Sequence, residues 1–80
     1  MPLPLPLPID TSVRVLAGRR KGLAGTIIES GTYQAKEGEP PIPFYWVEFA
    51  PEPVPWRKSD MPIWTYRPRA FFWGSELEII

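Results

Sequence analysis

Apolar and polar residues alternate with a period of two in several short stretches of the chain. Val13 and Val15 flank Arg14 in the stretch 12–16, the spacing expected of a strand with one buried face. The stretch 26–30 is β-branched and apolar at its start, which predicts a second strand.

The clearest strand pattern covers residues 44–49. Tyr45, Val47 and Phe49 occupy alternate positions, so these three side chains should point the same way. The intervening positions place the remaining side chains on the opposite face: Phe44, Trp46 and Glu48. One face of this strand is therefore predicted to pack in a core, while the other is unusually aromatic.

Proline and glycine divide the rest of the chain into shorter pieces. The 12 prolines disfavour long helices, because proline is confined to helix starts, turns and sheet edges. Further strands are predicted at 63–66, 71–73 and 77–80, with loops at 17–25 and 32–43 and either a loop or an edge strand at 50–62. Within the turn 74–76 we expect Glu76 to act as a turn cap, and we expect Glu78 to face solvent.

These patterns predict an all-β fold, a small five-stranded SH3-like barrel with long proline-rich loops. A chain of 80 residues has room for one domain. Residues 1–10 begin with alternating proline and leucine, which predicts an extended, proline-rich N-terminal strap. Residues 11–80 should form the barrel.

Charge and missing residue types narrow the function. Nine basic and nine acidic residues cancel, so no overall field attracts the chain to polyanions. The sequence contains no cysteine and no histidine, which removes thiolate chemistry and the commonest metal ligand and general base. We therefore expect no catalytic residues, no metal and no cofactor. No stretch reads as a secretory signal or a bilayer span, so no membrane insertion and a cytoplasmic location are expected.

The first predicted hairpin carries a recognisable motif. The stretch Val13-Arg-Val-Leu-Ala-Gly-Arg-Arg-Lys-Gly-Leu-Ala-Gly-Thr-Ile27 resembles the KOW motif of certain ribosomal proteins and NusG-like transcription factors. The resemblance implies that the alternating valines face a core and that Gly25 permits close packing before Ile27. It also implies an RNA-facing loop, in which Arg19, Arg20 and Lys21 would contact phosphates. The alternative is a solvated loop whose charges keep the protein soluble.

A second resemblance covers the later strands. The segments Tyr45-Trp-Val-Glu-Phe49 and Phe72-Trp-Gly-Ser-Glu-Leu77 are similar to the central strand and the final turn of SH3-like barrels. They resemble in particular the PsaE-like small subunits of photosystem I and the ferredoxin-docking subunit of the photosynthetic NDH complex. This resemblance implies a small accessory protein that docks onto a larger assembly.

The chain has more large aromatic residues than one small core can bury, and Trp73 is one of them. An exposed aromatic patch usually marks a binding surface, and arginine beside tryptophan serves protein and nucleic-acid contacts alike. We expect the following residues to bind a partner: Trp46, Trp56, Arg57, Lys58, Trp64, Tyr66, Arg67 and Arg69. The alternative is a second small core beneath the prolines and the N-terminal strap.

Three functions remain open. The first is a non-catalytic module that docks onto a protein partner or larger complex, and the second is KOW-type binding of RNA or ribonucleoprotein. The third and most remote is an oligomeric enzyme like the plasmid-borne dihydrofolate reductases, whose Val-Gln-Ile-Tyr segment this chain lacks. Exposed aromatics also allow self-association.

Overall fold

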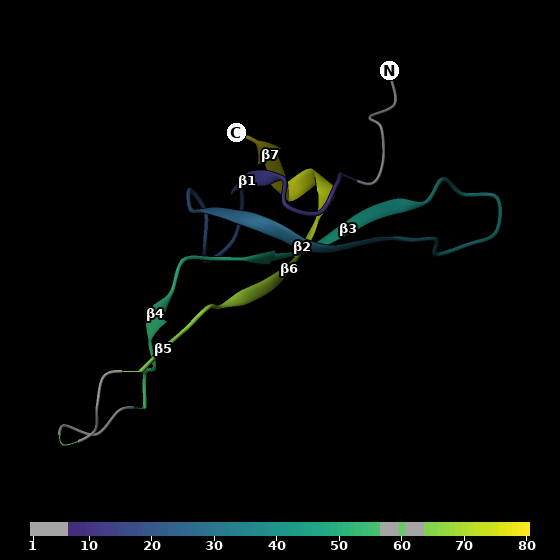
Figure 1. Cartoon of the computed structure of the whole chain (residues 1–80). Helices are drawn as coiled ribbons and strands as arrows, with labels where there is room; N and C mark the ends of the chain where they lie inside the picture. Colours follow the sequence, from purple (N-terminus) through teal and green to yellow (C-terminus); the bar gives the residue numbers. More distant parts are fainter. Residues whose placement is uncertain (1–6, 57–59, 61–63) are drawn as a thin grey trace.

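The computed structural model describes residues 7–56, 60 and 64–80, and they form an almost entirely β structure (Figure 1). One 3₁₀ turn, η1, interrupts the strands. The elements run in this order: β1 (Ser12–Val15), β2 (Ala24–Tyr33), β3 (Ile42–Glu48), β4 (Glu52–Pro53), β5 (Thr65–Tyr66), β6 (Arg69–Trp73), η1 (Gly74–Glu76) and β7 (Leu77–Ile79). The predicted all-β class is confirmed.

Five strands form one antiparallel sheet in the order β6-β3-β2-β1-β7. Because β7 returns to pair with β1, the sheet curls round its core without joining its two ends. Within the described part of the chain, β6 and β7 remain separate edges. The five strands agree with the prediction. The sheet is open, however, because the two edge strands, β6 and β7, lie on either side of η1 and do not pair with each other.

The inner face of the curled sheet holds the core. Its buried side chains come from β1, β2, β3 and β6 and from the residue after β3: Val13, Val15, Ile27, Tyr45, Val47, Phe49 and Phe72. The alternation predicted for 12–16 and 44–49 is therefore confirmed. The glycine prediction holds as well, because a Cβ on Gly25 would lie 2.5 Å from Val47 Cγ1 and 2.9 Å from the Glu48 carbonyl oxygen.

One strand prediction needs correction. The stretch 63–66 was expected to join the barrel, but β5 pairs only with β4 in a separate two-stranded sheet; Ile63 lies outside the described residues. The fourth strand of the main sheet is instead β6, which pairs along β3. Prolines on either side of β4 and before β6 explain the error, because they restrict pairing to short runs without excluding it.

The end of the N-terminal strap that the structure describes rests on the core. Leu7 packs against the buried cluster, and its backbone N–H donates to the Tyr45 hydroxyl at 2.9 Å. Thr11 then donates through Oγ1 to the Pro8 carbonyl at 2.7 Å. The strap thus enters the fold on the inner face of the sheet, and residues 1–6 lie outside the described part.

In Figure 1 the β4–β5 ribbon projects away from the five-stranded sheet. The molecule is accordingly elongated, with extents of 56 × 27 × 21 Å. Over the residues described, no helix is long and apolar enough to cross a membrane.

Candidate functional site

The outer face of the sheet carries a continuous row of aromatic side chains, which we call the outer aromatic strip: Tyr33, Phe44, Trp46, Phe71 and Trp73. Each member lies close to another. The ring centroids are 6.1 Å apart for Tyr33 and Trp73, and 5.1 Å apart for Phe71 and Trp73. From Phe71 the row continues to Phe44 at 5.5 Å and to Trp46 at 5.7 Å.

Strand register brings these rings together. Phe44 lies opposite Trp73, and Trp46 lies opposite Phe71, so four aromatic side chains occupy two cross-strand pairs on one face. Four of the strip's five members expose more than a third of their surface: Tyr33 52%, Trp46 38%, Phe71 40% and Trp73 37%. The strip is therefore a surface feature of the described residues.

A β-bulge in β2 helps to build this face. The register with β3 shifts between Ile27 and Glu29, which inserts one residue and turns the rest of β2 over. Without the shift, a period of two from buried Ile27 would turn Tyr33 inward. Gly31 completes the arrangement, because a Cβ there would come within 2.5 Å of the Phe44 ring. The ring can lie over β2 only because that side chain is absent.

Ion pairs close one end of the strip. Glu48 accepts from Arg69 Nε at 3.2 Å and lies 3.8 Å from Arg67 Nη1. Arg69 and Glu48 also face each other in the register of β3 and β6. Both predicted arginines therefore border the strip, but they share one carboxylate, so their positive charge is partly neutralised.

Three of the predicted aromatic residues lie elsewhere, on the β4–β5 hairpin and its tip. Trp56 and Trp64 meet edge to face with ring centroids 6.2 Å apart, and Tyr66 belongs to β5. We call these three residues the aromatic arm. All three are exposed. Arg57 and Lys58 lie outside the described residues.

The three basic residues of the loop 17–25 have different surroundings. Arg20 pairs with Glu52 at 3.2 Å, and its guanidinium lies 4.8 Å from the centre of the Phe49 ring. Arg19 and Lys21 are exposed. Because this loop leads into the beginning of β2 and the strip lies toward the other end, the basic loop is not brought to the strip. Through Glu52, which lies opposite Tyr66, Arg20 is instead connected to the β4–β5 hairpin.

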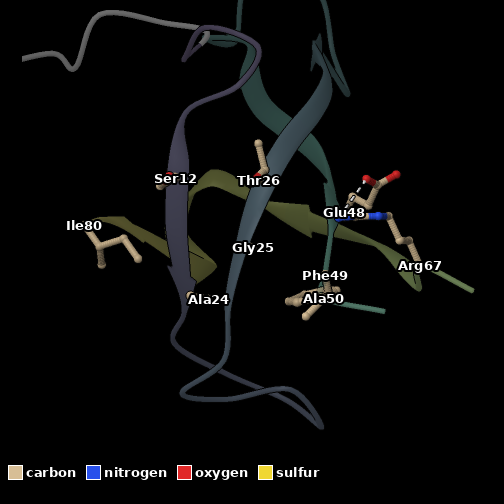
Figure 2. Close-up of a pocket in the computed structure, with 9 residues that line it drawn as sticks. All are labelled: Ser12, Ala24, Gly25, Thr26, Glu48, Phe49, Ala50, Arg67 and Ile80. Atoms are coloured by element: carbon tan, nitrogen blue, oxygen red, sulfur yellow. Dashed lines mark ion pairs between the residues drawn. The ribbon is translucent and has the colours of Figure 1, made fainter. Parts of the chain in front are cut away.

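A shallow depression of about 280 Å³ lies between β1, β2 and the end of β3 (Figure 2). Its charged groups are Glu48 and Arg67, which face each other across the dashed ion pair in Figure 2. The remaining lining is small or apolar: Ser12, Ala24, Gly25, Thr26, Phe49, Ala50 and Ile80. A carboxylate already held by two arginines is poorly placed to act as a general base.

Metal-binding groups are also scarce in the region that the structure covers, where no three carboxylates gather closely enough to hold an ion.

Glu76, predicted to be a turn cap, does cap η1: its Oε1 accepts from the Trp73 N–H at 2.9 Å. Glu78 faces solvent as predicted and pairs with Arg14 at 3.3 Å.

Sequence reasoning missed two members of the strip, Tyr33 and Phe71. The signal for Phe71 was present, since it alternates with Phe72 and shares its face with Trp73. The position of Tyr33 could not be predicted in this way, because the bulge changes the face of the sheet on which it lies.

Comparison with protein-family models, curated proteins and solved structures finds no match to this chain.

Proposed function

We propose that the protein is a non-catalytic binding module that docks onto a protein partner through the outer aromatic strip. One observation carries the proposal: five aromatic side chains, four of them exposed, form an unbroken row on the face of the sheet opposite the core. Large exposed apolar patches of this kind mark interaction surfaces.

The charges around the strip indicate the chemistry of the partner. No member of the strip is charged, whereas Glu48, Arg67 and Arg69 cluster at its end. An uncharged aromatic centre with a polar rim is the composition of a protein–protein interface, and tryptophan and tyrosine are frequent hot-spot residues. We therefore expect a partner that presents an apolar, uncharged contact surface.

The SH3-like resemblance agrees with this proposal. The strand order and the 3₁₀ turn before the last strand support an SH3-like arrangement of docking-subunit type. The KOW-like hairpin supports RNA binding as a second candidate, and bases do stack on aromatic sheet faces. We favour a protein partner, because Arg20 already pairs with Glu52 and lies against the Phe49 ring.

The test compares what three forms of the protein retain from extract of the source cell, with and without nuclease treatment. They are the wild type, a strip variant with Trp46→Thr and Phe71→Thr, and an arm variant with Trp56→Thr and Trp64→Thr. The strip variant removes one directly opposed cross-strand pair, and the arm variant removes the same number of rings from a different surface. Circular dichroism verifies that each variant is folded.

The expected result is a protein that the wild type and the arm variant retain and the strip variant loses. Equal retention by all three forms would contradict the proposal. Retention that disappears on nuclease treatment, with salt-sensitive binding of single-stranded RNA by the wild type, would favour the RNA function instead.

A further inference from the structure

Strand β6 leaves one side of the main sheet unpaired. It stands last in the strand order and pairs only with β3 in the part of the chain described. An unpaired strand edge presents backbone donors and acceptors that another strand can complete. β6 is also the strand that carries Phe71 and Trp73, so its open edge borders the outer aromatic strip.

The register shows which backbone groups point outward. The Phe49 N–H donates to the Pro68 carbonyl at 2.9 Å, so the Pro68 carbonyl faces β3. Backbone groups alternate between the two sides of a strand, and those of Arg69, Phe71 and Trp73 therefore point to the open side. The Trp73 N–H is already bonded to Glu76. Arg69 and Phe71 present both an N–H and a carbonyl at the edge.

A second β6 is complementary to this edge. If two copies meet antiparallel about a two-fold axis at Phe71, the two Phe71 side chains face each other and each Arg69 faces the partner's Trp73. Aromatic pairs and arginine beside tryptophan both stabilise such contacts. A shift that centres the axis on Arg69 would instead oppose two arginines, which is unfavourable.

We propose that two copies of this chain pair through the open edges of β6, with Phe71 opposite the partner's Phe71. Four backbone hydrogen bonds join the strands: two between the Phe71 residues, and one from each Arg69 N–H to the carbonyl of the partner's Trp73. The two main sheets become one, and the two outer aromatic strips meet at the two-fold axis. This contact adds to the proposed docking function, since it leaves the face of the strip exposed.

The test measures the mass of the protein by analytical ultracentrifugation over a wide concentration range. We expect the wild type to dimerise reversibly. Phe71→Lys and Phe71→Glu each place like charges on the two-fold axis, and each should raise the dimer dissociation constant by at least about tenfold. An equimolar mixture of the two variants should regain dimers, because opposite charges then meet.

The control is Trp46→Lys, which charges the same face one strand inward, on β3. Edge pairing predicts that this variant still dimerises, whereas dimers formed by stacking two strips face to face would be lost. A monomeric wild type at all concentrations, or a charge-swapped mixture that stays monomeric, would overturn the pairing. Either result would leave the docking proposal standing, because the face of the strip can bind a partner without a second copy of the chain.

Discussion

The two faces of β3 carry similar side chains in opposite environments. On the inner face, Tyr45 is 1% exposed and Val47 is fully buried, whereas Trp46 on the outer face is 38% exposed. Apolar side chains on the inner face contribute to folding because they leave water when the chain folds. Those on the outer face keep a large part of their surface in water, and this part is available to a partner.

Hydrophobic content therefore does not by itself locate the core of this protein. The sheet has enough inner residues to fold and a second aromatic set that is only partly covered by its own members. If this division is correct, inner substitutions should mainly lower the free energy of unfolding, and outer substitutions should mainly reduce binding.

The largest effect is expected from a substitution in the centre of the core. Ile27→Ala removes a fully buried side chain and should lower the free energy of unfolding by about 2–5 kcal/mol. Urea titration followed by tryptophan fluorescence measures this loss. The matched control is Ile79→Ala, where the side chain is 63% exposed; equal losses at both positions would break the distinction between the faces.

Two glycines in β2 allow the inner and outer faces to be compared through smaller losses of stability. Gly25→Ala forces a methyl group against Val47 and the Glu48 backbone, and should destabilise the fold by about 1–3 kcal/mol. For Gly31→Ala the three nearest atoms all belong to the Phe44 ring, which lies on the outer face and can turn away. Thermal unfolding should therefore show a larger loss for Gly25→Ala, and the reverse order would contradict the packing described.

The strap contact tests whether the N-terminal residues belong to the inner face. Tyr45→Phe keeps the buried ring but removes the hydroxyl that accepts from the Leu7 N–H, and should lower the free energy of unfolding by about 1 kcal/mol. Faster exchange of the Leu7 amide hydrogen would accompany this loss. An unchanged exchange rate would mean that the hydrogen bond does not hold the strap.

The smallest effect concerns the basic loop. Arg20→Ala removes both the ion pair with Glu52 and the contact with the Phe49 ring, and should destabilise the protein by about 1 kcal/mol. Arg19→Ala, the adjacent control, should change stability by less than about 0.5 kcal/mol. Equal effects at the two positions would show that Arg20 has no structural role.

Much of the inner face could be predicted from the sequence, because alternation is reliable where a strand is regular. Val13, Val15, Tyr45 and Val47 lie where a period of two places them. The fourth strand of the sheet was misplaced, since the run at 63–66 has strand-forming residues but prolines limit its pairing to two residues of β4. Whether a short strand joins the main sheet depends on long-range contacts.

The candidate site was only partly predictable. Trp46, Arg67 and Arg69 do lie on or beside the strip, but Trp56, Trp64 and Tyr66 lie on the arm, where strand pairing separates them from it. Arg20 pairs with Glu52, a contact that the sequence did not indicate, and its phosphate contact stays a prediction. Partners distant in sequence decide these outcomes, and local patterns carry no information about them.

The central claim is that the outer aromatic strip is a contact surface and not part of the folding core. Urea unfolding of the variant with Trp46→Thr and Phe71→Thr tests it most directly. We expect a loss of about 1–2 kcal/mol in the free energy of unfolding, the scale of substitutions on a partly exposed strand face. A loss of about 4 kcal/mol or more, as for a buried aromatic side chain, would show that the strip holds the fold together and would contradict the claim.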